Sequence, residues 1–335
     1  MTQQALTAQA QLLPADRVAT LIATGAAMLI AGDETLLRTL PRGRWIGGSI
    51  PYFMAESGGI ISREHVFVHR LPAAVTEVWI RDYDVERLSH LVQEAPENGF
   101  SILILPAGSE VHASYARNAP SYEEMFLKPV VGWASGTHLD DLGQRTPKVF
   151  NGEQGFMSDQ KAVVLHARLP DTLTAHVGII NLFTQGLGDK LVFPTTGFQA
   201  QTCLINGRKH NFADYILSHE IDTRLPLVAN YCGAMINVSF QSVHQADHQV
   251  NFYAPVFEGV EYRLAEPVPD YMAGFQSALP TDLADITFSC NCILNFLYFE
   301  LEGKRTGALV GPMTFGEIAY QLLNQTLVYL TLESC

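Results

Sequence analysis

The hydrophobic positions of this chain change between strand-type and helix-type spacing along its length. Residues 65–71 (HVFVHRL) and 76–83 (TEVWIRDY) alternate apolar and polar side chains, which predicts two neighbouring strands of a half-buried sheet. Residues 101–105 (SILIL) are continuously apolar, as in a strand that is covered on both faces. Residues 85–95 carry apolar side chains at helical spacing and predict an amphipathic helix. Strand patterns dominate the C-terminal half.

These patterns predict an α+β fold with two lobes, each a mostly antiparallel β-sheet flanked by helices. Residues 1–13 are polar and rich in Ala and Gln, and we expect a flexible N-terminus there. The first lobe is expected over 14–150 and the second over 151–335, because 139–155 is a polar, turn-rich connection. No heptad or short-period repeat is visible, but residues 46–56 weakly echo 286–317: both hold an apolar run with a Gly or Cys cluster and end at a lone Glu.

Composition narrows the class of protein. The chain has 335 residues, of which 47% are hydrophobic and 16% charged, so it can bury a large core. A net charge of −13 argues against a nucleic-acid partner, which would need a basic surface. No run of eighteen apolar residues predicts a membrane helix, and the N-terminus lacks the pattern of a signal peptide, so we expect a cytoplasmic protein. The odd number of cysteines, five, favours free thiols.

Common catalytic and cofactor signatures are absent from the sequence. It contains no dinucleotide-binding glycine motif, Walker loop, nucleophile elbow or His-Glu-x-x-His motif, and we predict no cofactor. Cys290 and Cys292 form Cys-Asn-Cys on an apparent strand, where alternation places both thiols on one face. A zinc site would need a second pair of ligands that the chain does not supply. Buried, unreactive thiols are the commoner state of such residues.

A lone carboxylate stands out in the apolar C-terminal stretch. Glu317 ends the segment 311–317 (GPMTFGE), between two apolar runs, and a buried charge needs a partner, a ligand or water. If Thr314–Glu317 is a turn, Glu317 faces a pocket to which Asn324 and Thr326 offer an amide and a hydroxyl group. Alternatively, Glu317 only stabilises its own turn. The residue types alone favour neither alternative.

The same stretch resembles a known family. Residues 288–292 (FSCNC), 311–319 (GPMTFGEIA) and 324–327 (NQTL) resemble the C-terminal half of the FIST domain, and 45–52 (WIGGSIPY) is more faintly similar to its N-terminal half. The resemblance implies a sensory module that binds a small ligand, such as an amino acid, and signals to a partner. The chain departs from the family pattern at Asn291-Cys292, where Gly-Arg is usual, and at Tyr52 to Glu56, where Gly-Glu is usual.

We therefore expect a small polar ligand in the cleft between the lobes and a separate signalling partner. A homodimer is a further option. The expected site residues are Ser49 and Tyr52 from the first lobe, and Cys290, Asn291, Glu317, Asn324 and Thr326 from the second.

Two alternatives remain open. One is an enzyme on the same scaffold, with Cys290 or Cys292 as nucleophile or Glu317 as general base. The other is a heme-binding gas sensor with His210 or His176 as axial ligand. No c-type attachment motif is present, so such a heme would be held without a covalent bond.

Overall fold

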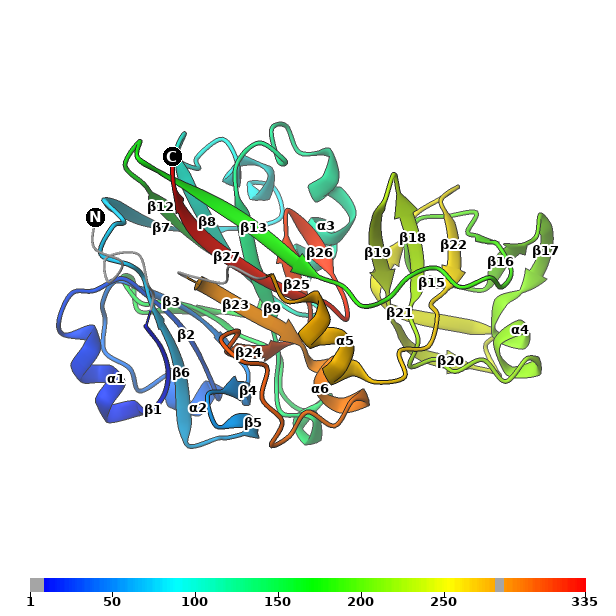
Figure 1. Ribbon diagram of the computed structural model, residues 1–335, viewed down its shortest axis with the longest axis horizontal. Coiled ribbons are helices and arrows are strands. Elements are labelled where there is room, and N and C mark those ends of the chain that lie inside the picture. Colours follow the sequence, from blue (N-terminus) through cyan, green and yellow to red (C-terminus); the bar gives the residue numbers. More distant parts are fainter. Residues whose placement is uncertain (1–8, 281–285) are drawn as a thin grey trace. The chain divides into compact units, whose positions relative to one another are not determined.

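The computed structural model describes residues 9–280 and 286–335, and it shows a mixed α+β protein that consists mainly of strands (Figure 1). The chain divides into two compact units. Unit 1 comprises the chain as far as Ile180, together with Leu279–Gln321 and Leu327–Cys335; unit 2 comprises Asn181–Ala278 and Leu322–Thr326. This division differs from the predicted lobes, because strands from both ends of the chain build the sheets of unit 1. The expected boundary between 150 and 151 falls within strand β10 (Val149–Asn151).

A flexible N-terminus was expected over residues 1–13. Residues 1–8 lie outside the described part of the chain. From Gln9 to Pro14 the chain instead forms strand β1, which pairs antiparallel with β6 (His65–Arg70). Helix α1 (Ala15–Ile22) follows directly. The ladder to β6 gives the backbone of this polar segment its hydrogen bonds, and a composition rich in Gln and Ala does not reveal such pairing.

Unit 1 contains the same strand-and-helix topology three times. Each repeat has a first strand, a parallel strand pair joined by a helix, a hairpin, and a return strand antiparallel to the pair. The first repeat consists of β1, β2 (Met28–Gly32), α2 (Glu34–Leu37), β3 (Trp45–Ser49), β4 (Tyr52–Ala55), β5 (Gly58–Ile61) and β6. The second consists of β7 (Glu77–Tyr83), β8 (Gly99–Pro106), α3 (Glu110–Asn118), β9 (Val130–Ser135), β10, β11 (Phe156–Ser158) and β12 (Ala162–Arg168). The third consists of β13 (Leu173–Ile180), β23 (Ile286–Cys292), α6 (Ile293–Tyr298), β24 (Gly311–Thr314), β25 (Glu317–Ala319), β26 (Gln321–Leu323) and β27 (Leu327–Ser334). Of β26, only Gln321 belongs to unit 1.

The hairpins link the repeats in a cycle. The orders of the three sheets are β1-β6-β2-β3-β10-β11, β7-β12-β8-β9-β25-β26 and β13-β27-β23-β24-β4-β5. The hairpin of each repeat therefore pairs with the sheet of another repeat: β10-β11 extends the first sheet, β25-β26 the second and β4-β5 the third. Every sheet is antiparallel except for its one parallel pair, β2–β3, β8–β9 or β23–β24.

One glycine position recurs in the three parallel pairs. Gly47, Gly132 and Gly311 occupy equivalent sites in β3, β9 and β24. A Cβ atom there would meet the carbonyl oxygen of the neighbouring parallel strand, that of Ile30 at 2.9 Å, Leu103 at 1.8 Å or Ser289 at 2.0 Å. The close approach of the strands therefore requires glycine. This repeated requirement explains part of the sequence echo between 46–56 and 286–317.

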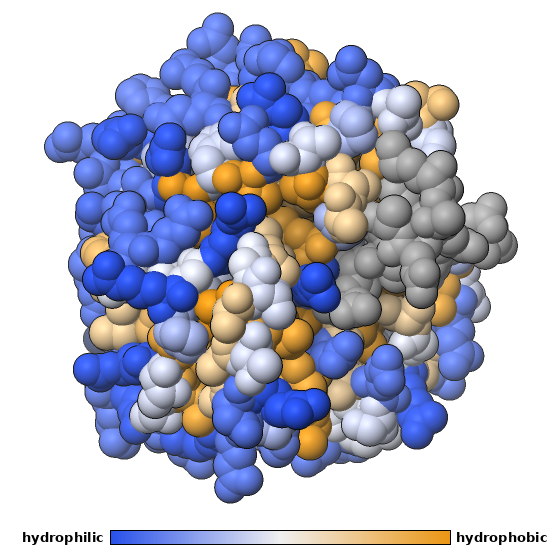
Figure 2. Space-filling view, turned by 90° about the vertical axis from the view of Figure 1, so that its left-hand side faces the viewer, coloured by the Kyte–Doolittle hydropathy of each residue, from blue (hydrophilic) through white to orange (hydrophobic). Residues whose placement is uncertain are grey.

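The core of unit 1 lies against the inner faces of its sheets. Trp133 of β9 stacks on Phe288 of β23 with 5.6 Å between ring centroids, so two repeats share one aromatic cluster. On the first sheet, Val18 and Ile22 of α1 pack with Met28, Trp45 and other buried side chains. Figure 2 shows one face of the molecule on which hydrophobic side chains gather in the middle while hydrophilic ones surround them.

Unit 2 is inserted into the third repeat, between β13 and β23. It consists of β14 (Leu191–Val192), β15 (Gly197–Ala200), β16 (Thr202–Ile205), β17 (Arg208–Asn211), α4 (Phe212–Ser218), β18 (Leu227–Tyr231), β19 (Ala234–Val238), β20 (Phe240–His244), β21 (Gln249–Val256), β22 (Glu261–Leu264) and α5 (Tyr271–Ala278). These strands form the sheets β17-β16-β14-β22-β18-β19 and β15-β21-β20, which enclose a core of their own around Phe193, Phe212 and Phe252. Within the described residues, no helix is long and apolar enough to cross a membrane.

Candidate functional site

A polar site lies where the carboxyl ends of β2, β3 and β9 meet in unit 1. Ser49 is the last residue of β3 and Gly136 follows β9. The Gly136 amide donates to the Ser49 carbonyl oxygen at 2.6 Å, and the Ser49 hydroxyl donates to the Gly136 carbonyl oxygen at 2.8 Å. Two repeats are thus joined at this edge. The carboxyl ends of parallel strands are the usual place for ligands in mixed and parallel sheets.

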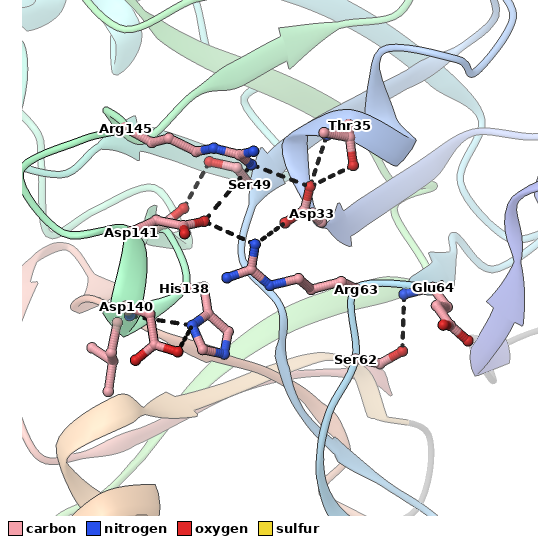
Figure 3. Close-up of polar contacts among 12 residues, drawn as sticks. Asp33, Thr35, Ser49, Ser62, Arg63, Glu64, His138, Asp140, Asp141 and Arg145 are labelled. Carbon is pink, nitrogen blue, oxygen red and sulfur yellow. Dashed lines mark hydrogen bonds and ion pairs between the residues drawn. The ribbon is translucent and has the colours of Figure 1, made fainter.

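A small hollow, with a cavity volume of about 10 Å³, lies at this edge and is called the polar pocket below. It is lined by Asp33, Glu34, Ser49, Ile50, Pro51, Gly136, Thr137, His138, Asp141 and Arg145. Figure 3 shows that Arg63 points its guanidinium group between Asp33 and Asp141, with Arg145 on the other side of the two carboxylates. Charged groups of both signs therefore face one another here.

The ion pairs of the polar pocket differ in length. Arg63 Nη1 lies 3.0 Å from Asp141 Oδ2 but 4.0 Å from Asp33 Oδ2. The hydrogen bond with Arg63 lowers the pKa of Asp141 and raises that of Arg63. Arg145 Nη1 stays 3.7 Å from Asp141 and 3.8 Å from Asp33, and its side chain is 41% exposed. The guanidinium of Arg145 therefore retains donors for a ligand.

Asp33 is held in place by the start of α2. Its Oδ1 atom accepts hydrogen bonds from the Thr35 amide at 2.9 Å and the Thr35 hydroxyl at 2.6 Å, so Asp33 is the N-cap of the helix. Only 5% of Asp33 is exposed. This carboxylate is thus fixed in orientation before any ligand arrives.

Two hydroxyl groups near the pocket lack hydrogen bonds within the described residues. They belong to Thr137, which lines the pocket and is 5% exposed, and to Ser135 at the end of β9, which is fully buried. A buried hydroxyl without a partner costs about 1–3 kcal/mol, so water or a ligand group is expected to meet it. Of the two residues, Thr137 is the one that lines the pocket.

An aromatic pair forms the neighbouring wall. His138 stacks on Tyr52 with 5.5 Å between ring centroids, and its Nδ1 atom accepts a hydrogen bond from the Asp140 amide at 3.2 Å. The Tyr52 hydroxyl accepts one from the Leu139 amide at 3.0 Å. Burial raises the pKa of Tyr52, so it stays a neutral phenol.

Comparison with protein families assigns the chain to a family. A family model matches residues 13–333, nearly the whole sequence, and its description is "Family of unknown function (DUF6976)". The chain belongs to the DUF6976 family. No curated protein matches it.

Of the site residues predicted from the sequence, two lie at the polar pocket. Ser49 lines it, and Tyr52 stacks on the lining residue His138. Residues 45–52 thus contribute to the polar pocket.

The predicted residue Glu317 lies in the core of unit 1 and does not line the polar pocket. It begins β25 opposite Trp133, is fully buried, and accepts a hydrogen bond from the Thr314 hydroxyl at 3.3 Å. A bend at Phe315-Gly316 connects β24 to β25 and places Glu317 there. This position, without contact to solvent, favours the alternative in which Glu317 stabilises its own surroundings.

Cys290 and Cys292 lie on one strand, β23, as the alternation predicts, and both are buried. Burial, and then the negative charge of Glu317, raise the pKa of the Cys290 thiol well above its usual value. Its Sγ atom donates to the Gly132 carbonyl oxygen at 3.3 Å. A protonated thiol in the core is a poor nucleophile, which counts against the enzyme hypothesis for Cys290.

Asn291 also lies in the core, with 3% of its surface exposed. Its Oδ1 atom accepts from the Cys292 amide at 2.7 Å and from Asn295 Nδ2 at 2.9 Å. These bonds hold the start of α6 against β23. The side chain therefore has a structural role at the end of the third parallel pair.

Asn324 and Thr326 belong to unit 2, where Asn324 takes part in a buried network of amide side chains. Asn324 Nδ2 donates to the Leu323 carbonyl oxygen at 3.0 Å, and its backbone oxygen accepts from Asn237 at 3.1 Å. Next to it, Gln325 accepts from the Ser239 hydroxyl at 2.6 Å. The network attaches the segment Leu322–Thr326 to the rest of unit 2.

The histidines suggested as heme ligands, His176 and His210, are both exposed. His176 lies on β13 with its Nε2 atom 3.4 Å from Glu333 Oε2. Neither side chain lies in a buried apolar environment, which a non-covalent heme would need. Among the residues that the structure describes, no group of three or more His, Cys, Asp or Glu side chains could hold a metal ion.

The sequence did not point to Asp33, Arg63, His138, Asp141 or Arg145. Two of them, Asp141 and Arg145, fall in the polar segment 139–155, which is interpreted from the sequence as a connection between lobes. A usable signal was present: Asp33 directly follows the apolar strand 28–32, Ser49 ends the strand 45–49, and Thr137 and His138 lie shortly after the strand 130–135. It becomes informative only once those strands are known to be paired in parallel.

Proposed function

We propose that the protein is a sensory binding protein that recognises a small zwitterionic ligand in the polar pocket. The single observation that carries this proposal is the position of Arg145, at 3.7–3.8 Å from two carboxylates and short of hydrogen-bond contact with either. A ligand carboxylate would gain charge-assisted hydrogen bonds from Arg145, while a ligand ammonium group would meet Asp33 or Asp141. A ligand that carries both a carboxylate and an ammonium group leaves the net charge of the pocket unchanged.

The remaining lining groups suit the same ligand. The Thr137 hydroxyl lacks a partner within the described residues and would complete its hydrogen bonding on a ligand oxygen. The free volume of the pocket is only about 10 Å³, so the partly exposed side chains of Arg63 and Arg145 must move aside to admit a molecule of the size of an amino acid. We place the ligand within unit 1, whereas the sequence led us to expect it between two lobes.

The FIST resemblance supports a sensory role and remains a hypothesis, as does the finer FIST-like description of the fold. In that role the occupied pocket would be recognised by a separate signalling protein. Ligand binding at the edge where Ser49 and Gly136 join two repeats would alter the 136–145 loop, the surface closest to the ligand.

Isothermal titration calorimetry with common L-amino acids tests the proposal. We expect saturable binding of at least one amino acid, and loss of binding for its N-acetyl and carboxamide derivatives, each of which lacks one charge. Arg145→Gln should weaken binding about tenfold or more, the value of one charge-assisted hydrogen bond pair. Arg87→Gln, which removes an exposed arginine that pairs with Glu94, is the matched control and should bind as the unaltered chain does.

Absence of saturable binding at millimolar concentrations across the panel would rule out a zwitterionic amino acid. Binding that Arg145→Gln leaves unchanged would place the ligand elsewhere. Turnover of a bound amino acid, detected by mass spectrometry, would favour an enzyme instead.

A further inference from the structure

A second hollow lies at the opposite ends of the same strands of unit 1. It has a volume of about 470 Å³ and is called the arginine hollow below. It is lined by Gly25, Ala26, Ala27, Arg44, Arg70, Leu71, Pro72, Ala73, Val75, Thr76, Glu77 and Val78. The lining comes from the segments that precede β2 and β3 and from the connection between β6 and β7. It shares no residue with the polar pocket.

Two guanidinium groups of this hollow are uncommitted. Arg44 and Arg70 are exposed, and neither side chain makes a hydrogen bond or ion pair with another residue in the ranges 9–280 and 286–335. The carboxylate among the lining residues, Glu77, lies 3.1 Å from Arg168 and is balanced by it. The hollow thus has a local excess of positive charge in a chain whose net charge is −13.

Most of the remaining lining residues have apolar side chains, although polar atoms make up the larger part of the exposed surface of the hollow. Leu71 and Pro72 are buried, while Val75 and Val78 are half-buried and keep part of their surface open to the hollow. An inorganic anion would use only the two arginines. An organic anion would also cover these side chains, and each buried methylene group contributes roughly 0.8 kcal/mol in transfer from water.

We infer that the arginine hollow binds a small organic anion, with its carboxylate or phosphate on Arg44 and Arg70 and its apolar body against Leu71, Val75 and Val78. Guanidinium groups match planar oxyanions through paired N–H donors, which favours a carboxylate over a spherical ion. The site is independent of the proposed amino-acid pocket, so either hypothesis can fail without the other.

Benzoate is the probe for this site, with benzamide as its uncharged equivalent and inorganic phosphate as the anion without an apolar body. We expect benzoate to shift the backbone amide resonances of Ala26, Ala27 and Leu71 in a saturable way, phosphate to bind more weakly, and benzamide not to bind. The double variant Arg44→Gln/Arg70→Gln should weaken benzoate binding at least about tenfold. Arg117→Gln, an exposed arginine in the last turn of α3, is the matched control.

Each other outcome overturns the inference. Equal binding of benzoate and benzamide would show that charge is irrelevant. Phosphate binding as tight as that of benzoate would leave no role for the apolar lining. Resonance shifts confined to residues outside the hollow, or unchanged benzoate affinity in the double variant, would place the anion elsewhere. Because both arginines are exposed, the double variant is expected to fold, which its amide spectrum reports directly.

Discussion

The hydroxyl and carbonyl groups of Ser49 both bond to Gly136, at 2.8 and 2.6 Å, across the boundary between the first and second repeats. The same hydroxyl also accepts the Lys148 amide at 2.8 Å. One buried side chain therefore fixes two of the segments that surround the polar pocket.

Ser49→Ala should destabilise unit 1 and distort the pocket. The substitution leaves the Gly136 carbonyl and the Lys148 amide without their side-chain partner, at a cost of about 1–3 kcal/mol for buried groups. Urea denaturation measures the free energy of unfolding. Ser277→Ala, which removes an exposed hydroxyl bonded within α5, should change it by less than about 0.5 kcal/mol. Equal stability of the two variants would mean that the Ser49 bonds contribute nothing.

Acid should destabilise the fold before its carboxylates titrate. Burial lowers the pKa of His69 and His112 to about 4 and that of His166 to about 3, against an ordinary value near 6.5. The unfolded chain therefore binds more protons than the folded chain below pH 6.5, so stability is full above that pH and falls as the pH drops toward 4.

The loss at pH 5 should be about 2 kcal/mol for each of the three histidines. Urea denaturation at pH 7 and pH 5 measures it, and His166→Gln should reduce the difference between the two pH values. His166 is bonded to Ser101 at 2.8 Å and Tyr83 at 3.1 Å, so the variant will also be less stable at pH 7. A free energy of unfolding that is the same at both pH values would contradict the buried, neutral state of these rings.

Gly132→Ala should prevent unit 1 from folding. Gly132 has a φ of 153°, and an added Cβ atom would lie 1.8 Å from the Leu103 carbonyl oxygen, which is backbone and cannot move aside. We expect a loss of more than about 3 kcal/mol, seen as loss of cooperative thermal unfolding. Gly188→Ala is the control, because nothing lies within 4 Å of its added Cβ atom. A cooperative transition at the unaltered temperature would show that β8 and β9 can separate.

Glu317→Ala should lower stability without altering recognition in the polar pocket. Removal of the fully buried side chain leaves a cavity and takes an acceptor from Thr314, for a combined loss of roughly 3 kcal/mol. Calorimetric titration of the folded variant with the amino acid that binds best should give the unaltered affinity. A selective loss of affinity with stability unchanged would restore Glu317 as a binding residue.

The sequence predicts individual strands and helices better than it predicts which strands pair with one another. The strands at 65–71, 76–83 and 101–105 follow from alternation and from continuous apolar runs, and all three form. The amphipathic pattern at 85–95 predicts a helix, but only a 3-10 helix forms, at Leu88–Leu91, with Leu88 and Leu91 buried.

The three-repeat topology was hidden from sequence inspection for a different reason. The copies share chain path and the glycines at 47, 132 and 311, but few other side chains, and the third copy is interrupted by unit 2. Arg63, Asp141 and Arg145 converge with Asp33 only through this topology, so no local spacing indicates the pocket. Ser49 and Tyr52 were predicted as site residues because a family resemblance covered their segment.

The exchange of hairpins between repeats also sets an order of events during synthesis. Strand β4 is made early, but its partner in the third sheet is β24, whose residues lie some 250 positions further along the chain. Until Gly311–Thr314 has been translated, the edge of β4 has no companion on that side, and unit 2 emerges in the interval. The N-terminal part of unit 1 must therefore wait, with open strand edges that a chaperone could shield.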